Sequence, residues 1–117
     1  SRKDVKSRIL VMGYTFKENC PDARNSLVSS LIDSLSIKGA EIAIYDPWVE
    51  RESLEVRHQS MLLEGISDGV FDGVVIAVAH KQFKEMGAAS VQRICRFPSC
   101  VFDVKGVFGQ KFGFQRL

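Results

Sequence analysis

Four short apolar runs, separated by longer stretches of mixed polarity, dominate the hydrophobic pattern along the chain. They occupy residues 8–13, 41–45, 71–79 and 99–104. A continuous apolar run of this length is typical of a strand buried on both faces of a parallel sheet, because neither face then needs polar side chains. We therefore predict one buried strand in each run.

Helical periodicity occupies the stretches that follow the first and third runs. Residues 26–39 carry apolar side chains at helical spacing, namely Leu27, Val28, Leu31, Ile32 and Leu35. Gly39 is suited to end this helix, because glycine readily adopts the positive φ of a helix C-terminus. Residues 80–87 and 88–96 predict two further short helices.

The segment between the second and third runs has weaker signals. Pro47 ends the second strand, because proline cannot donate to the ladder. Residues 49–55 predict a short helix, and residues 55–60 predict a further strand at the edge of the sheet. Residues 61–69 and the Gly- and Phe-rich tail at 105–117 have no clear period, so no element is assigned to them.

The alternation of strands with helices predicts one α/β domain over residues 1–117, a three-layer α/β/α Rossmann-like sandwich. With residues 55–60 counted as the third strand, we expect a mostly parallel five-stranded sheet in the order 3-2-1-4-5. Ligands of such sheets bind beyond the carboxyl ends of the strands. The loops that follow the apolar runs are therefore where a site is expected.

Composition and charge exclude several classes of partner. The chain has 117 residues, 45% of them hydrophobic, which is enough for one modest core. Its 16 Lys and Arg residues are spread along the sequence and nearly balanced by 14 Asp and Glu residues, so we expect neither a nucleic-acid nor a membrane partner. The apolar runs are too short to span a bilayer and no secretory signal opens the chain, which predicts a soluble, cytoplasmic protein.

The cysteines give no sign of a disulfide framework or a metal centre. Cys20, Cys95 and Cys100 are an odd number without CxxC spacing. This pattern argues against paired disulfides and against a zinc site. We expect three reduced thiols and no metal.

The loop after the first strand carries the most distinctive chemistry. It lacks GxGxxG, so it cannot place a pyrophosphate on a helix N-terminus in the way of a dinucleotide-binding fold. It offers instead the aromatic ring of Phe16, the ammonium of Lys17 and the guanidinium of Arg24. These groups suit a base that stacks and phosphates that need positive partners. The alternative is that Phe16 belongs to the core while Lys17 and Arg24 are merely solvated.

The same loop, Gly-Tyr-Thr-Phe-Lys-Glu-Asn-Cys-Pro-Asp-Ala-Arg-Asn-Ser at residues 13–26, resembles a known family segment. It is similar to the opening of the C-terminal, UDP-binding domain of the UDP-glucose/GDP-mannose dehydrogenase family, in particular the branch acting on UDP-N-acetylhexosamines in polysaccharide and O-antigen synthesis. Residues 45–48, 78–83 and 102–106 resemble later motifs of that family in the same order. The resemblance covers the chain from about Arg8 onward.

The resemblance implies that the chain is one domain of a longer enzyme. Family members oxidise the sugar C6 alcohol to a carboxylate in two NAD-dependent hydride transfers, through a thiohemiacetal and a thioester on a cysteine in their central region. NAD is bound mainly by an N-terminal domain, and a central helical region serves dimerisation. None of the three cysteines here matches that thiol. The resemblance thus implies a UDP-N-acetylglucosamine or UDP-N-acetylgalactosamine 6-dehydrogenase that is homo-oligomeric at full length, and a chain that is inactive alone.

Four site residues follow from the resemblance, none of them catalytic. Phe16 and Lys17 match a Phe-Lys pair used against the nucleotide sugar, with Lys17 as charge partner of substrate oxygens. Lys105 takes the place of a substrate-contacting basic residue after the last strand. Arg24 matches an arginine that reaches toward the bound NAD, which makes it the one cofactor-binding residue expected here.

Other residues near the strand ends have structural interpretations. We expect His80 to cap or pack, Trp48 to pack or lie at an interface, and Asp103 to fix the loop that holds Lys105. Tyr14 stands where leucine is frequent in the family, and Ala23 where a bulkier residue is frequent. These two departures affect fine specificity without removing a charged ligand-binding group.

Two other classes of function compete with the dehydrogenase domain. One is a non-catalytic Rossmann-like interaction or regulatory module, in which Phe16 and Trp48 serve packing. The other is a stand-alone small α/β enzyme. It is disfavoured because no nucleophile and base can be paired from the sequence.

Overall fold

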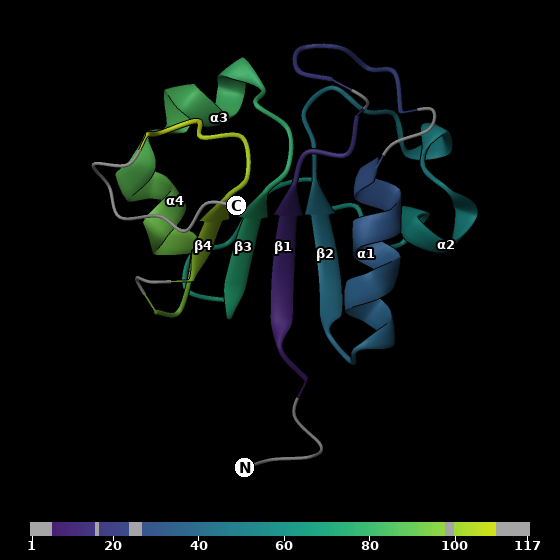
Figure 1. The fold of residues 1–117 in the computed structure, drawn as a ribbon, viewed down its shortest axis with the longest axis horizontal. Coiled ribbons are helices and arrows are strands. Elements are labelled where there is room, and N and C mark those ends of the chain that lie inside the picture. The colour runs from purple at the N-terminus through teal and green to yellow at the C-terminus, as the bar shows by residue number, and fades with distance from the viewer. Residues whose placement is uncertain (1–5, 16, 24–26, 98–99, 110–117) are drawn as a thin grey trace.

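A four-stranded parallel sheet forms the centre of the computed structural model, which describes residues 6–15, 17–23, 27–97 and 100–109 (Figure 1). The strands are β1 (Arg8–Met12), β2 (Glu41–Tyr45), β3 (Gly73–Ile76) and β4 (Val101–Asp103). They lie in the order β2-β1-β3-β4, and every neighbouring pair is parallel. All the strands therefore direct their carboxyl ends to one edge.

Helices pack on both faces of this sheet. The helical elements are α1 (Leu27–Ile37), the 3₁₀ turn η1 (Arg51–Ser53), α2 (Val56–Gln59), α3 (Lys81–Met86) and α4 (Ala88–Ile94). The predicted α/β/α sandwich is confirmed, as are the helices at residues 26–39, 80–87 and 88–96 in their main parts. None of the helices in the described part of the chain is long and apolar enough to cross a bilayer.

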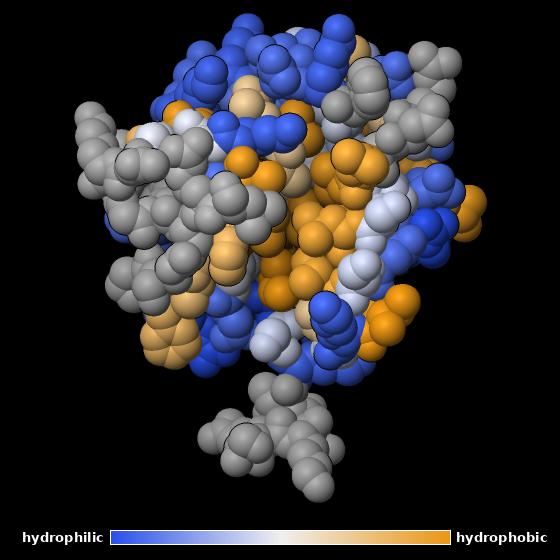
Figure 2. All heavy atoms as spheres, in the orientation of Figure 1, coloured by the Kyte–Doolittle hydropathy of each residue, from blue (hydrophilic) through white to orange (hydrophobic). Residues whose placement is uncertain are grey.

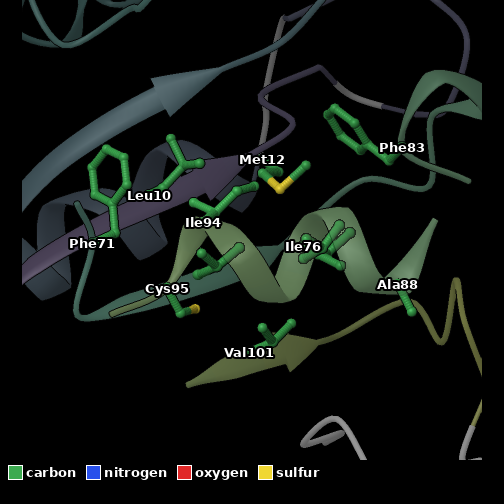
Figure 3. Packing of buried hydrophobic residues seen from close by; sticks show 11 residues of the cluster. Leu10, Met12, Phe71, Ile76, Phe83, Ala88, Ile94, Cys95 and Val101 are labelled. Carbon is green, nitrogen blue, oxygen red and sulfur yellow. The ribbon is translucent and has the colours of Figure 1, made fainter. Parts of the chain in front are cut away.

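The two faces of the sheet have separate cores, because successive strand side chains point to opposite sides. Leu10 and Met12 of β1 pack with Ile76 and Ile94 on the face covered by α3 and α4 (Figure 3). Val11 packs on the other face, in a cluster with residues of α1 and β2 that includes Val28, Ile32, Ile42 and Ile44. Burial on both faces explains why the strands are continuously apolar in the sequence.

The prediction of a fifth strand was wrong. Residues 56–59 form α2, and the described residues contain four strands. His58 is only 1% exposed, because its ring forms hydrogen bonds with Tyr14 and Asp33. The chain forms a helical turn beside α1 at this point, which places the ring toward these partners. A few residues after α2, Leu62 forms a single β-bridge with Ile44 at the outer edge of β2. Without the missing strand, the observed order equals the predicted one.

Gly13 sets the direction in which the chain leaves β1. Its φ is 102°, a left-handed value that side chains other than hydrogen disfavour. A Cβ at this position would lie 2.6 Å from the Cβ of Val78, so no side chain fits. The amide of Gly13 still donates to the carbonyl of Tyr45, at 2.8 Å. Glycine thus lets the following loop begin directly over the carboxyl edge of the sheet.

Candidate functional site

Two exposed lysines lie in loops that leave the carboxyl edge of the sheet. Lys17 follows β1 and Lys105 follows β4, and β3 lies between these two strands. Within the part of the chain that the structure describes, neither ammonium group forms an ion pair. Unpaired cations at a strand-end edge are suited to an anionic ligand such as a phosphate.

The other two predicted site residues, Phe16 and Arg24, lie outside the described residues. Of the four predicted site residues, the structure thus places Lys17 and Lys105, which lie at the same edge of the sheet. The roles of the Phe16 ring and the Arg24 guanidinium stay predictions.

Asp46 anchors the start of the Lys17 loop. This buried side chain follows β2, and its Oδ2 accepts the amides of Tyr14 and Thr15 at 2.7 and 3.3 Å. Its Oδ1 accepts the amides of Trp48 and Val49 at 2.7 and 3.1 Å. One carboxylate therefore ties the loop after β1 to the turn after β2.

Burial and hydrogen bonding act in opposite directions on this carboxyl group. Burial is the largest single effect and raises the pKa of Asp46. The hydrogen bonds from His80 and from the amides of Tyr14 and Trp48 outweigh it, so the pKa lies below its ordinary value of 3.8. Asp46 is therefore ionised at neutral pH.

His80, which is fully buried at the end of the segment after β3, binds the same loop from the other side. Its Nε2 lies 2.9 Å from Oδ2 of Asp46 and 3.1 Å from Oγ1 of Thr15. Its Nδ1 accepts the amide of Asn19 at 2.9 Å. The side chain of Asn19 in turn accepts the amide of Lys81, at 2.8 Å. The loop is thereby fastened to the start of α3.

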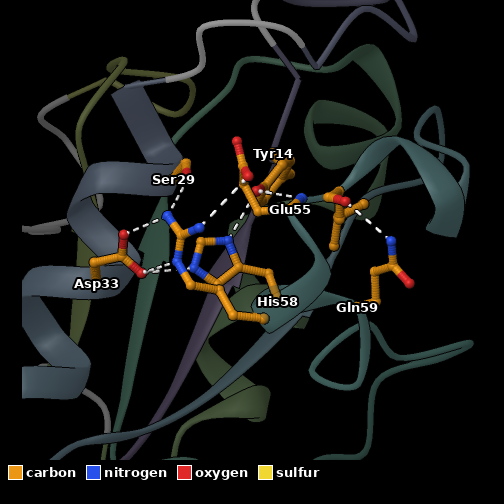
Figure 4. A network of polar contacts seen from close by, with 8 residues as sticks. Tyr14, Ser29, Asp33, Glu55, His58 and Gln59 are labelled. Carbon is orange, nitrogen blue, oxygen red and sulfur yellow. Dashed lines mark hydrogen bonds and ion pairs between the residues drawn. The ribbon is translucent and has the colours of Figure 1, made fainter.

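A second polar network holds the first residue of the loop from the α1 side (Figure 4). The hydroxyl of Tyr14 lies 2.8 Å from Nδ1 of His58, and Nε2 of His58 lies 2.8 Å from Oδ1 of Asp33 on α1. Arg57 forms two further bonds with Asp33, at 2.6 and 2.9 Å. The Arg57 guanidinium, followed by His58, holds the pKa of Asp33 well below its usual range. This network joins α1, α2 and the loop after β1.

The loop that bears Lys105 is fixed by Asp103, as the sequence predicts. Asp103 is fully buried, and its carboxylate accepts the amides of Val107 and Phe108 at 2.8 and 3.0 Å. The amide of Gly106 donates to the carbonyl of Asp103 at 3.1 Å. Both lysines are thus carried by loops that are anchored through buried aspartates at or beside a strand end.

A large apolar groove runs along the sheet beside α1. It has a volume of about 690 Å³ and is lined mainly by aliphatic side chains of α1, β1 and β3, with Val104 and Lys105 among the residues that line it. Figure 2 shows it as an orange hollow on the face that carries α1. Leu27 and Phe102 line it as well and are 86% and 44% exposed. The apolar wall suits hydrophobic side chains better than it suits a phosphate.

Two observations at the strand ends bear on a metal ion and on a dinucleotide pyrophosphate. No group of three or more His, Cys, Asp or Glu side chains gathers within those residues in a way that could hold a metal. A dinucleotide fold uses the free amides after its first strand for the pyrophosphate. Here the amides of Tyr14 and Thr15 already donate to Asp46. These two amides are therefore not available to a pyrophosphate.

A known protein family matches most of the chain. The UDP-binding domain of the UDP-glucose/GDP-mannose dehydrogenase family matches residues 10–110. The chain belongs to this family. It corresponds to the UDP-binding domain, and the matched residues include both loops that carry Lys17 and Lys105.

Individual relatives agree with the family. The chain is 36% identical over 99 residues to a UDP-N-acetyl-D-glucosamine 6-dehydrogenase of Pseudomonas aeruginosa, covering 85% of this chain and 24% of that protein. It is 32% identical over 101 residues to an enzyme of the same name from Salmonella typhi, covering 86% of this chain and 24% of that protein. The chain therefore spans about a quarter of the length of these relatives.

A solved structure supports the fold. The structure of a UDP-D-ManNAc dehydrogenase from Pyrococcus horikoshii superimposes with a TM-score of 0.70 at 24% identity. The match covers 95% of this chain and 25% of that one. The family domain thus has the same parallel-sheet architecture as this chain.

The sequence did not reveal which residues hold the Lys17 loop in place. Thr15, Asn19 and His80 meet in space, yet the contacts of His80 reach across 61 and 65 residues of chain. Two local features could have drawn attention to His80 and Asn19. His80 follows a strand, and asparagine tolerates a positive φ, which is 56° at Asn19. Neither feature predicts that these two residues contact each other.

Proposed function

We propose that this chain is the UDP-sugar-holding domain of a longer NAD-dependent UDP-N-acetylhexosamine 6-dehydrogenase, which oxidises the C6 alcohol of the sugar to a carboxylate. The family match over residues 10–110 is the observation on which the proposal rests. The names of the relatives from Pseudomonas and Salmonella favour UDP-N-acetylglucosamine as the substrate class. The protein of Staphylococcus aureus named CapL, 31% identical over 97 residues, is consistent with a role in polysaccharide synthesis.

The residues at the sheet edge are assigned the nucleotide part of the substrate. The ammonium groups of Lys17 and Lys105 would neutralise phosphate oxygens, each as a point charge with several possible hydrogen-bond directions. Phe16 would contact the nucleotide sugar beside Lys17. Arg24 would reach across an interdomain cleft toward NAD. Weak binding by this chain alone is expected, because a ligand that normally touches two domains here meets one.

The redox chemistry is assigned to other parts of the longer protein. NAD supplies the hydride acceptor, and its binding is assigned to an N-terminal domain, as the resemblance to the family implies. The use of the Tyr14 and Thr15 amides by Asp46 agrees with this assignment. The described cysteines do not offer a clear nucleophile either. Cys20, Cys95 and Cys100 are free, and burial raises the pKa of the Cys95 thiol to about 11. We therefore expect no oxidation of UDP-sugars by this chain by itself.

The remaining partners are the other domains of the longer protein and further copies of it. We place that protein in the cytoplasm as a homo-oligomer. Neither nucleic acid nor a membrane is a partner in this proposal.

Calorimetric titration of the chain with UDP tests the proposal. We expect Lys17→Ala and Lys105→Ala each to weaken UDP binding by about tenfold, the effect of one lost charge-assisted hydrogen bond. Lys84→Ala on α3 is the matched control, since it removes an equally exposed ammonium without touching either loop. Equal affinities for all three variants would refute the assignment of the site.

The apolar groove beside α1 favours a second candidate, the non-catalytic interaction or regulatory module. Leu27 and Phe102, which line it, are 86% and 44% exposed and would suit the apolar side chains of a partner. This candidate predicts that the chain ignores UDP altogether. Absence of a binding signal for the unchanged chain in the same titration would place it ahead of the dehydrogenase domain.

A further inference from the structure

We propose that His80 is a positioning residue of the nucleotide-binding loop: its Nδ1 holds the backbone of Asn19 and thereby sets the place of Lys17. The inference rests on the proposed function, because it assigns Lys17 to the ligand. It concerns a residue whose sequence context predicts only capping or packing. His80 touches no ligand in this account, and it acts through the loop.

The loop is exposed where it carries Lys17 and is held from the interior at two points. Lys17, Glu18 and Asn19 are exposed, and Thr15 and His80 are buried. Thr15 lies before Lys17 and donates its hydroxyl to the carbonyl of Lys17 at 2.9 Å. Asn19 lies after Lys17 and donates its amide to Nδ1 of His80 at 2.9 Å. The backbone around Lys17 is thus fixed on both sides.

The hydrogen bonds define the state of the imidazole. An amide N–H can only donate, so the bond from Asn19 requires Nδ1 of His80 to be the acceptor. The proton then resides on Nε2, which faces Oδ2 of Asp46 and Oγ1 of Thr15 at 2.9 and 3.1 Å. His80 is therefore a neutral ring with Nε2 protonated. Every polar atom of the ring has a partner.

Asn19 completes a reciprocal clamp between the loop and α3. Its amide donates to the ring of His80, while its side-chain oxygen accepts the amide of Lys81 at 2.8 Å. Its φ of 56° accompanies an arrangement in which the backbone amide reaches His80 and the side-chain oxygen reaches Lys81, both at the start of α3. A short exposed loop without such bonds would have to be ordered by the ligand, which costs affinity. The clamp supplies this order in advance.

Two substitutions separate the roles of the two ring nitrogens. Asparagine places its side-chain oxygen near the position of Nδ1, so His80→Asn keeps an acceptor for Asn19 and loses the donor to Asp46. Glutamine reaches toward the position of Nε2, so His80→Gln keeps the donor and loses the acceptor. Val91→Ala, a cavity in the core on the α4 face, serves as a control for lowered stability alone.

We expect the affinity for UDP to follow the bond to Asn19. In calorimetry, His80→Gln should bind UDP about tenfold more weakly than the unchanged chain, whereas His80→Asn and Val91→Ala should stay within about threefold. In ¹⁵N NMR of the unchanged chain, Nδ1 of His80 should have the shift of an unprotonated nitrogen. The amide of Asn19 should exchange slowly in the unchanged chain and in His80→Asn, and rapidly in His80→Gln.

Failure of this inference and failure of the proposed function have different signatures. If the unchanged chain binds UDP and His80→Gln binds it equally well although the Asn19 amide exchanges rapidly, the positioning role is refuted. If the unchanged chain binds no UDP, the proposed function fails. The heteronuclear NOE of Lys17 and Glu18 then decides the positioning role: lower values in His80→Gln than in His80→Asn support it, and equal values refute it.

Discussion

Single buried residues at strand ends decide where the exposed loops of this domain lie. Asp46 accepts four backbone amides and faces His80, and Gly13 fits its backbone where any Cβ would meet Val78. Neither residue is assigned a contact with a ligand. Both position the loop of Lys17 through contacts with other residues of the chain.

Gly13→Ala should lower the free energy of unfolding by roughly 3 kcal/mol, because the added methyl group would lie 2.6 Å from the Cβ of Val78 at a φ of 102°. Urea unfolding measures the effect. Gly39→Ala is a suitable control, since its φ of 98° imposes a similar backbone penalty and nothing lies within 4 Å of the added Cβ. Equal losses for the two variants would contradict the close approach of β1 to Val78.

Asp46→Asn should cost about 3 kcal/mol at neutral pH, since an amide NH₂ would then face backbone N–H groups in place of a carboxylate oxygen. The pKa of Asp46 is lower in the folded chain than its ordinary value of 3.8, so its ionised form stabilises the fold above about pH 4. That contribution is lost as the pH falls below this value. Urea unfolding of both proteins at several pH values should show the difference shrinking in acid, and a constant difference would contradict the ionised state.

Among the helices and strands, polar contacts determine the conformation of residues 55–60, which the hydrophobic pattern did not predict. β1 and α1 could be predicted, because an apolar run and an apolar helical face each have one simple solution. Residues 55–60 could not, because Val56 is 83% exposed while His58 is buried, the reverse of what their hydrophobicity suggests. His58 is buried through bonds to Tyr14 and Asp33, which lie 44 and 25 residues away.

Tyr14→Phe tests this network. It should lower the free energy of unfolding by about 1–3 kcal/mol, because Nδ1 of the buried His58 and the amide of Glu55 would lose their partner. Tyr45→Phe is the matched control, since the Tyr45 hydroxyl has no hydrogen bond among the described residues. Thermal and urea unfolding should show little change for the control. A loss of the same size in both variants would argue against the Tyr14–His58 bond.

For the molecule as a whole, the sequence predicted the architecture and the loops that lie at the carboxyl edge of the sheet. The loops after β1 and β4 could be named because ligands of parallel sheets bind at carboxyl ends, and Lys17 and Lys105 stand there. The clamp around Lys17 could not be predicted, because His80 reaches Asp46, Thr15 and Asn19 only after the chain folds. The groove beside α1 was equally unforeseen, since apolar periodicity predicts a buried face without saying what covers it.

An amide NMR titration of the ¹⁵N-labelled chain with UDP, and separately with NAD, shows whether the loops at the carboxyl edge bind the nucleotide. We expect UDP to shift the amides of Lys17 and Lys105 and of their loop neighbours, and NAD to have little effect on them. UDP shifts confined to α1 and β3 on the wall of the apolar groove, or the same response to NAD as to UDP, would contradict this expectation.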